Sequence, residues 1–397
     1  MGERLVRFAD LCDNKELEIG AGRPRSEALH LPVLRVADVL EGRIQSPSQA
    51  CESTTQSQKL GPKTSRPGDI VLTVKGTVGR VAIMPPDGST FAYSPQLCFF
   101  RPTAGGSLKP RYLYYWLKSE EFWKQVRPLK AQTDMADFLS LGDLNSLTVL
   151  VPPARKQQAI AEVLGAFDDK IAANDRIAKA AIELARWIYR QNTMQFPESR
   201  LSSVLLPRLG GTPKRSDESL WGGGIPWASA RDVTGAPHGI ILSTSESITE
   251  VAGRAKRLTP LPAGSVVLTA RGTVGEVARL GVAAAINQSC YGFVPDRIPG
   301  TSLFFAVENI AAQVRSMAHG SVFDTITMRT FDHVSVPDLS DRDWFLLEDR
   351  IAGLVARGEY AVAESSLLAR TRDELLPLLM SGKIRVKDAG QVANGVL

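Results

Sequence analysis

Residues that commonly perform catalysis or bind metals are few and scattered in this chain. The cysteines form no Cys-x-x-Cys pair and have no histidine at metal-ligand spacing; they are Cys12, Cys51, Cys98 and Cys290. The histidines are expected to be surface or packing residues; they are His30, His238, His319 and His333. The sequence therefore predicts free thiols and no metal site.

Motifs that bind cofactors are also missing. No Gly-x-Gly-x-x-Gly follows a strand and opens a helix, and Gly382-Lys383 is followed by Ile384 instead of Ser or Thr. The Pro-Pro pairs at 85–86 and 152–153 precede Asp and Ala, whereas an amino-methyltransferase needs an aromatic residue there. The Gly-Thr-Val-Gly segments are too short to cradle a phosphate and are expected to be hairpin turns. We expect no cofactor and no catalytic site in this chain.

The composition fits a globular protein of two or three domains, because 44% of the 397 residues are hydrophobic and 22% are charged. The formal net charge of +5 permits nucleic-acid binding without proving it. The N-terminal segment has no apolar run of signal-peptide length, and no stretch approaches 18 uninterrupted apolar residues. We expect a cytoplasmic protein without a membrane span.

The chain contains two copies of one unit. Residues 68–82 (GDIVLTVKGTVGRVA) match residues 264–278 (GSVVLTARGTVGEVA), and the first glycines of the turn are 272 − 76 = 196 positions apart. Asp38 matches Asp232 (232 − 38 = 194), Gln96 matches Gln288 (288 − 96 = 192), and Pro152 matches Pro337 (337 − 152 = 185). Matches in the same order at similar offsets indicate an internal duplication.

Each copy predicts strands, a short helix and a final strand. The β-branched runs at 70–74 and 266–269 predict one strand, and 80–84 and 276–280 predict the next. Apolar residues at helical spacing predict short helices over 111–126 and 303–317. A final strand then ends at Pro152 in the first copy and at Pro337 in the second, and a long helix follows.

Both long helical segments carry a seven-residue repeat of apolar or small residues. Such a narrow stripe favours pairing with another helix, although each helix could instead pack only on its own domain. Asn174 is expected to fix the register, and Pro377 to end or kink the second helix in its last turns. The residues expected at the interface between the helices are Ile160, Leu164, Phe167, Ile171, Asn174, Leu347, Ile351, Leu354, Leu368 and Leu375.

Together these features resemble those of specificity (S) subunits of type I restriction–modification systems, over nearly the whole chain. The resemblance rests on the duplicated GTVG turn and on the junction LTVLVPPARKQQAIAEVLGAFDDKI, in which Pro152-Pro153 precede Gln157-Gln158. The segments GGTPKRSDESLWGGGIPWASARDV and LLPLLMSGKIRV are similar to the usual opening of a recognition domain and the usual close of the last helix. The second junction lacks the glutamine pair and the first domain lacks the GxTP-like opening, so the alignment is weaker there.

The resemblance implies a mixed α/β (α+β) fold with two similar target-recognition domains joined by two long helices in an antiparallel coiled coil. The first recognition domain is expected at 1–152 and the second at 197–337. The long helices are expected at 153–196 and 338–383, and a flexible C-terminal tail at 384–397.

The resemblance also implies a function. Each domain would read one half of a bipartite sequence in double-stranded DNA, and the helices would set the spacer and dock two modification (M) subunits. These partners bind S-adenosylmethionine and methylate adenine, and two restriction (R) subunits add a nuclease that uses ATP and Mg. A helix of roughly 37 residues would be about 55 Å long and would span about 16 base pairs at most. The alternatives are a stand-alone coiled-coil scaffold, a subunit of a methylation-only complex without a nuclease, and a degenerate enzyme.

Basic residues in the loops beside the matched skeleton are the candidates for DNA contacts, since phosphates supply affinity and base edges supply specificity. Lys75 and Arg271 occupy the same place in the two copies, just before the GTVG turn. Gln96 and Gln288 could read adenine, but we expect them to satisfy backbone groups inside the fold, and we expect Trp221 and Trp227 in the core. The candidates are Lys63, Arg66, Lys75, Arg80, Arg101, Lys214, Arg215, Arg231, Arg254, Lys256, Arg257 and Arg271.

Overall fold

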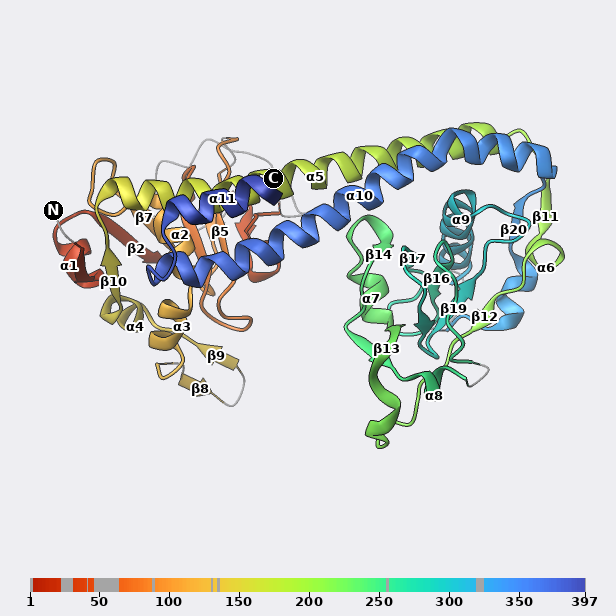
Figure 1. Ribbon diagram of the computed structural model, residues 1–397, viewed down its shortest axis with the longest axis horizontal. Coiled ribbons are helices and arrows are strands. Elements are labelled where there is room, and N and C mark those ends of the chain that lie inside the picture. Colours follow the sequence, from red (N-terminus) through yellow and green to blue (C-terminus); the bar gives the residue numbers. More distant parts are fainter. Residues whose placement is uncertain are drawn as a thin grey trace. The chain divides into compact units, whose positions relative to one another are not determined.

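The chain divides into two compact units, which are described separately. The computed structural model describes residues 3–22, 31–40, 42–45, 64–87, 90–129, 131–133, 136–254, 257–318 and 325–396. Unit 1 consists of residues 1–170 and 368–397, and unit 2 of residues 171–367. The long helices α5 (Ala154–Thr193) and α10 (Asp341–Met380) each contribute residues to both units (Figure 1). The boundaries expected from the sequence treat these helices as separate segments, whereas the contacts divide each helix between the two units.

Unit 1 is built on a four-stranded sheet in the order β2-β7-β4-β5, with every neighbouring pair antiparallel. These strands are β2 (Leu17–Ala21), β4 (Ile70–Thr73), β5 (Val81–Ile83) and β7 (Leu97–Pro102). The smaller ladders join β1 (Arg4–Arg7) to β10 (Thr148–Val151), β3 (Val33–Leu34) to β6 (Ala92–Tyr93), and β8 (Ala131–Thr133) to β9 (Ala136–Phe138). The short helices are α1 (Phe8–Asp13), α2 (Pro110–Lys118), α3 (Glu120–Val126) and α4 (Leu141–Ser146).

Unit 2 repeats this plan with one more strand in its sheet, in the order β12-β19-β16-β17-β14. These strands are β12 (Arg208–Leu209), β14 (Ile240–Ile241), β16 (Val266–Thr269), β17 (Val277–Leu280) and β19 (Cys290–Phe293). Its other ladders join β11 (Glu198–Arg200) to β20 (Ser335–Pro337), and β13 (Trp221–Ala228) to β15 (Glu246–Ile248) and β18 (Ala285–Ile286). Its short helices are α6 (Leu201–Val204), α7 (Ala230–Thr234), α8 (Glu250–Gly253) and α9 (Gly300–Ala318).

The main ladders of the two units match, which confirms the predicted duplication. In each unit an antiparallel ladder joins the first strand to the strand before the following long helix, β1 with β10 and β11 with β20. A parallel pair also recurs, β3 with β6 and β13 with β18. Even the extra strand of unit 2 has a counterpart, because Gly42 forms an isolated parallel bridge with Ala82 of β5.

The central strands β4 and β16 are fully buried because both of their faces are covered. In unit 2, Val266 and Leu268 belong to the core cluster that contains the apolar side of α9. Val267, which points to the opposite face, belongs to a second cluster with Ala278 and Ile286. Continuous apolar strands of this kind, IVLT and VVLT, therefore form the centre of each unit.

The long helices contact each other in antiparallel orientation within each unit. In unit 2, Asn174 Nδ2 donates a hydrogen bond to Glu364 Oε2 over 2.6 Å, and Arg350 Nη1 donates to Asn192 Oδ1 over 2.8 Å. The later residue of α5 thus contacts the earlier residue of α10, as expected for antiparallel helices. In unit 1, Arg372 Nη1 pairs with Asp168 Oδ1 over 2.5 Å. The helices are therefore paired, and the interpretation in which each packs only on its own domain is wrong.

Two features of the helices differ from the sequence prediction, and a third agrees with it. The helix predicted over 111–126 is two helices, since Ser119 has an extended backbone and its hydroxyl caps α3 by accepting from Phe122 N. Pro377 lies in the last turn of α10, which ends three residues later at Met380, as predicted. The segment 384–397, predicted to be a flexible tail, contains the helix α11 (Val386–Val396) with Ala389 and Ala393 buried.

Candidate nucleic-acid interface

The GTVG segment of unit 1 is a hairpin turn between β4 and β5, and hydrogen bonds to a buried threonine stabilise it. Thr73, which is 0% exposed, donates a hydrogen bond from Oγ1 to Thr77 O over 2.6 Å and accepts one from Arg80 N over 2.9 Å. Gly79 N donates to Thr73 O over 2.9 Å. One buried side chain therefore fixes both ends of the turn, and Lys75, Gly76 and Thr77 remain exposed.

The turn of unit 2 repeats this arrangement atom for atom. Thr269, also 0% exposed, donates from Oγ1 to Thr273 O and accepts from Glu276 N over 2.9 Å. Gly275 N donates to Thr269 O over 3.0 Å, and Arg271 at the start of the turn is exposed. We call the two turns, residues 75–79 and 271–275, the hairpin tips; their first three residues are exposed.

Glycine is required in the tips for two reasons. Gly76 and Gly272 have φ values of 82° and 76°, a left-handed conformation that other residues rarely adopt. A Cβ atom at Gly79 would lie 2.3 Å from the ring of Trp123, so this position has no room for a side chain. The prediction of hairpin turns at both GTVG segments is confirmed.

A second exposed turn lies beside each hairpin tip. Leu97 N donates to Ser94 O over 3.0 Å in unit 1, and Cys290 N donates to Asn287 O over 3.0 Å in unit 2. Strand register pairs Thr73 with Leu97 and Thr269 with Cys290. We call these turns, whose central residues are 95–96 and 288–289, the glutamine turns.

The register corrects two expectations about the glutamines. Gln96 aligns with Ser289 in the strand register, one position from the sequence match to Gln288, because Leu97 and Cys290 are the residues that pair with the matching threonines Thr73 and Thr269. Both glutamine side chains are exposed and make no hydrogen bond to any residue in the described ranges. The expectation that they satisfy backbone groups inside the fold is therefore wrong.

Most of the predicted DNA-contacting residues lie on the surface. The exposed candidates without an ion pair in the described part of the chain are Arg66, Lys75, Lys214, Arg231, Arg254, Arg257 and Arg271. Arg80 is half-buried, and its Nη1 donates to Val39 O over 3.3 Å. Lys63 and Lys256 lie outside the described residues.

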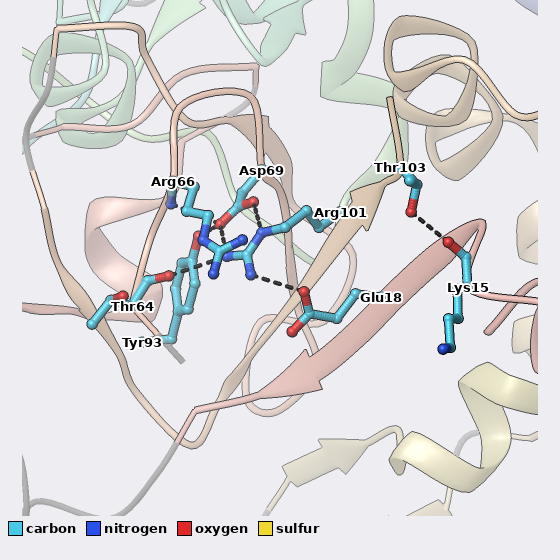
Figure 2. A network of polar contacts seen from close by, with 8 residues as sticks. All are labelled: Lys15, Glu18, Thr64, Arg66, Asp69, Tyr93, Arg101 and Thr103. Carbon is cyan, nitrogen blue, oxygen red and sulfur yellow. Dashed lines mark hydrogen bonds and ion pairs between the residues drawn. The ribbon is translucent and has the colours of Figure 1, made fainter. Parts of the chain in front are cut away.

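Arg101 is part of a buried ionic network instead of an open surface (Figure 2). Its Nε and Nη2 donate to the two oxygens of Asp69 over 2.6 and 2.7 Å, its Nη1 donates to Glu18 over 3.0 Å, and Asp69 is 1% exposed. Tyr93 donates its hydroxyl to the same carboxylate, and burial together with this negative charge raises the pKa of the phenol. Arg101 also donates to Thr64 O, so the network holds the chain at that point. These contacts favour a structural role for Arg101.

Arg215 is likewise engaged by its own unit. Its guanidinium carbon lies 4.0 Å from the ring centroid of Trp221 and 5.1 Å from that of Trp227, and its Nη2 donates to Glu246 over 3.0 Å. Trp227 is 0% exposed and donates Nε1 to Gly211 O over 3.0 Å, which confirms its predicted place in the core. Arg215, an exposed side chain, therefore stacks on the two tryptophans of this segment.

The seam residues of the long helices are mostly buried, but they are only part of the buried helix surface. The predicted interface residues that are buried are Ile160, Leu164, Phe167, Asn174, Leu347, Ile351, Leu368 and Leu375, whereas Ile171 and Leu354 are half-buried. Ile182 and Tyr189 of α5, outside the seam, join the core of unit 2. The helices thus bury one face against each other and another against the globular part of each unit.

A buried glutamine that sequence reasoning did not single out as structural fixes the start of α5. Gln157 is 0% exposed, its Nε2 donates to Ser107 O over 2.8 Å and to Pro152 O over 2.7 Å, and its Oε1 accepts from Lys109 N over 2.9 Å. Lys109 is the N-cap residue of α2. The position of Gln157 in the motif Pro-Pro-x-x-x-Gln-Gln was the sequence signal that could have identified this role.

Unit 2, which lacks the glutamine pair, makes the equivalent connection with Glu348 of α10. Its carboxylate accepts from Thr301 N over 2.9 Å and from Ser302 N and Oγ over 2.8 Å, at the first turn of α9. A carboxylate is favourable there because the free amides at a helix N-terminus carry partial positive charge. The missing motif in the second junction therefore reflects a change of residue type with the connection retained.

The described residues offer little for other chemistry. No group of three or more His, Cys, Asp or Glu side chains among them could hold a metal ion. Within the same ranges, no helix is both long enough and apolar enough to cross a membrane. His238 Nε2 lies 3.0 Å from Asp175 Oδ1 and packs a loop of unit 2 on α5, whereas His333 is exposed.

These observations define a class of protein: a duplicated mixed α+β protein in which two similar units share paired helices and each presents the same exposed turns. Comparison with protein families matches residues 32–183 and 196–339 to the Type I restriction modification DNA specificity domain. The two matches cover more than half of the chain. The chain therefore belongs to the family of type I restriction–modification specificity subunits, with two DNA recognition domains.

Individual relatives agree with this assignment. A putative type I restriction enzyme MjaX specificity subunit of Methanocaldococcus jannaschii is 18% identical over 391 residues, which cover 92% of this chain and 90% of the relative. The type I restriction enzyme HindI specificity subunit of Haemophilus influenzae is 18% identical over 81% of this chain and 88% of the relative. A crystal structure of a type I restriction–modification S subunit from M. genitalium is similar with a TM-score of 0.58 and 14% identity, over 96% of both chains. The predicted fold class is confirmed.

Proposed function

We propose that this chain reads a two-part sequence in double-stranded DNA, one part with each recognition domain, and directs two methyltransferase (M) subunits to it. The observation that carries this proposal is the pair of matching hairpin tips. Each tip presents a cationic side chain, Lys75 or Arg271, on an exposed turn that a buried threonine holds in place. A rigid turn with a cation at its end can contact a phosphate and fix the position of a domain on the duplex.

The paired helices supply a surface for the M subunits. In unit 2, Arg186 and Tyr189 of α5 face the globular part, where Arg186 pairs with Glu308 over 2.7 Å. Trp187 and Leu184 lie on another face of α5 and are 59% and 48% exposed. On α10 a second exposed stripe has seven-residue spacing and contains Leu346, Tyr360 and Leu367. Large exposed apolar side chains on paired helices fit association with a partner's helices.

The chemistry would come from the partners. The M subunits would bind S-adenosylmethionine and methylate adenine, and R subunits, where present, would use ATP and Mg to cleave DNA. This chain would contribute recognition and spacing, since each long helix of 40 residues runs through both units. A helix of that size is about 60 Å long.

The DNA-reading role is tested with the full chain assembled with its M subunits and a library of random duplexes. We expect enrichment of a motif in two parts separated by a spacer of fixed length. Enrichment of no motif, or of a single uninterrupted one, would contradict the proposal. Saturable binding of S-adenosylmethionine by this chain alone would instead support the enzyme alternative.

The phosphate-contact role of the hairpin tips is tested by salt dependence. Lys75→Ala and Arg271→Ala should each weaken binding similarly for all sequences and reduce the slope of log K against log salt by about one. Lys179→Ala is the matched control, because this exposed lysine of α5 pairs only weakly with Glu183, at 4.0 Å. An unchanged slope for both tip variants would remove the tips from the interface.

The docking role of the helices is tested by co-purification. Trp187→Glu should abolish the capture of M subunits because it places a charge in the exposed apolar face, and Lys179→Ala should leave capture unchanged. Undiminished capture by the Trp187 variant would support docking elsewhere on the chain.

A further inference from the structure

We propose that Gln96 and Gln288 are specificity-determining residues, each of which reads an adenine in the half-target of its own recognition domain. The inference rests on the proposed DNA-reading function and adds residues that the list of basic candidates does not contain. It starts from the finding that both side chains are exposed and without a hydrogen-bond partner in the described ranges.

The structure links each glutamine turn directly to a hairpin tip. In unit 1, Val74 N donates to Gln96 O over 2.9 Å, and Lys75 follows Val74 in the chain. In unit 2, Ala270 N donates to Ser289 O over 2.7 Å, and Arg271 follows Ala270. A cation and a carboxamide are therefore presented together at the same end of each sheet.

The glutamine turns themselves are held firmly. Each begins at the residue whose carbonyl accepts from the first amide of the following strand, Ser94 in unit 1 and Asn287 in unit 2. Asn287 Oδ1 also accepts from Ser289 N over 2.5 Å, which stabilises the turn of unit 2. Because all of β19 and the first four residues of β7 pair with the buried central strands, a shift of either turn would break these strand pairings.

The chemistry of the side chain selects the base. A carboxamide has a donor and an acceptor side by side, which match N7 and N6 of adenine in the major groove. The cation on the adjoining hairpin tip matches the phosphate backbone that borders the groove. The combination of a phosphate-binding tip and a neighbouring carboxamide is therefore suited to placing one amide against one base edge.

The duplication supports this reading over that of an ordinary surface glutamine. The two turns differ in sequence, Pro95-Gln96 in one and Gln288-Ser289 in the other, so the glutamine sits at different positions of the same two-residue turn. In both turns the glutamine is exposed and has a longer side chain than the other central residue, Pro95 or Ser289. The one-position difference also predicts that the two adenines lie at different distances from the tip contacts in their half-targets.

The test uses the full chain assembled with M subunits and sequencing of the duplexes that it selects from a random library. Gln96→Ala should remove the preference for adenine at one position of one half-target, a preference of about 5- to 150-fold, and leave the other half unchanged. Gln288→Ala should do the same in the other half, so each variant serves as the control for the other. Gln96→Glu should shift the preference at that position toward cytosine, because a carboxylate accepts a hydrogen bond from the amino group of this base.

The outcomes separate this inference from the function on which it rests. If the unmodified chain selects a two-part motif and both alanine variants select the same motif at every position, the inference is wrong and the proposed function stands. A uniform loss of affinity without relaxed sequence would assign the glutamines to phosphates and would also overturn it. If the unmodified chain selects no two-part motif, the proposed function is wrong, and the inference that rests on it is wrong as well.

Discussion

Replacing Gln157 should strongly destabilise unit 1, because its buried side chain joins the start of α5 to the start of α2. Gln157→Ala removes two hydrogen bonds donated to Ser107 O and Pro152 O and one accepted from Lys109 N. All three backbone groups would lose their partner in a site where the side chain is 0% exposed. At about 1–3 kcal/mol for each buried group left unsatisfied, partly relieved by water, the loss should reach about 3–5 kcal/mol.

The neighbouring residue is the matched control. Gln158 is exposed and its Nε2 donates only to Glu162, one helical turn further along α5. Such a pair contributes about 0.2–0.5 kcal/mol, so Gln158→Ala should barely change stability. Urea unfolding followed by circular dichroism measures both variants. Similar midpoints for the two variants would refute the assignment of Gln157 as the connection between α5 and α2.

The pH dependence of Gln157→Glu gives a second measurement on the same site. The introduced carboxyl would face two carbonyl oxygens, so burial and these acceptors should raise its pKa. The protonated form can donate one of the two lost hydrogen bonds, and the ionised form can donate neither. The variant should therefore be less destabilised at pH 5 than at pH 8, and a destabilisation independent of pH would contradict this account.

Three further predictions concern the core, the helix pairing and the thiols. Asp69→Asn should cost about 3 kcal/mol in unfolding free energy, because it leaves a buried guanidinium without its nearest counter-charge. Gly358→Leu should destabilise unit 2 by about 1–3 kcal/mol, since a Cβ there lies 3.1 Å from the facing α5 side chain, whereas Gly353→Ala, with open space around it, should stabilise by about 0.5–1 kcal/mol. Burial raises the pKa of the Cys98 and Cys290 thiols from 9.0 to about 12, so iodoacetamide at pH 9 should label neither in the folded protein. The neutral thiols stabilise the fold fully below pH 9, and this contribution should decline as the pH rises toward 12.

Each of these predictions has its own check. For the ionic network, Asp10→Asn removes an exposed ion pair with Arg7, which water screens, and should leave the urea midpoint nearly unchanged. Equal effects of the two aspartate variants would argue against a stabilising role for the network. For the helices, thermal unfolding in which both glycine variants shift the midpoint in the same direction would contradict the close approach of α5 and α10. Rapid labelling of either buried thiol at pH 9 would show that its strand opens readily.

Local patterns in the sequence were enough for the features whose cause is local. The apolar runs at 70–73 and 266–269 became central strands because β-branched residues favour extended backbone. The GTVG turns became hairpins because glycine permits positive φ, and the duplication was visible because both copies need the same turn residues. The seven-residue spacing indicated two long helices with a partner.

Other features depended on contacts between distant segments. Arg101 looked like a free cation in the sequence, but Asp69 and Glu18, 32 and 83 residues away, hold it in a network. The α2–α3 break at Ser119 was hidden because the apolar spacing continues across it. The glutamines were matched one position out of register, since only strand pairing aligns Gln96 with Ser289.

The sequence by itself determined the repeat, the turn chemistry, the long helices and the family, because these depend on residue type and on spacing along the chain. Only the tertiary structure decided which polar side chains are exposed and which are buried. That decision depends on strand register and on the packing of α2, α9, α5 and α10, which bring together residues that are far apart in sequence. Gln157 and Gln96 illustrate it: the same side chain is a fully bonded connection at one site and an uncommitted amide on an exposed turn at the other.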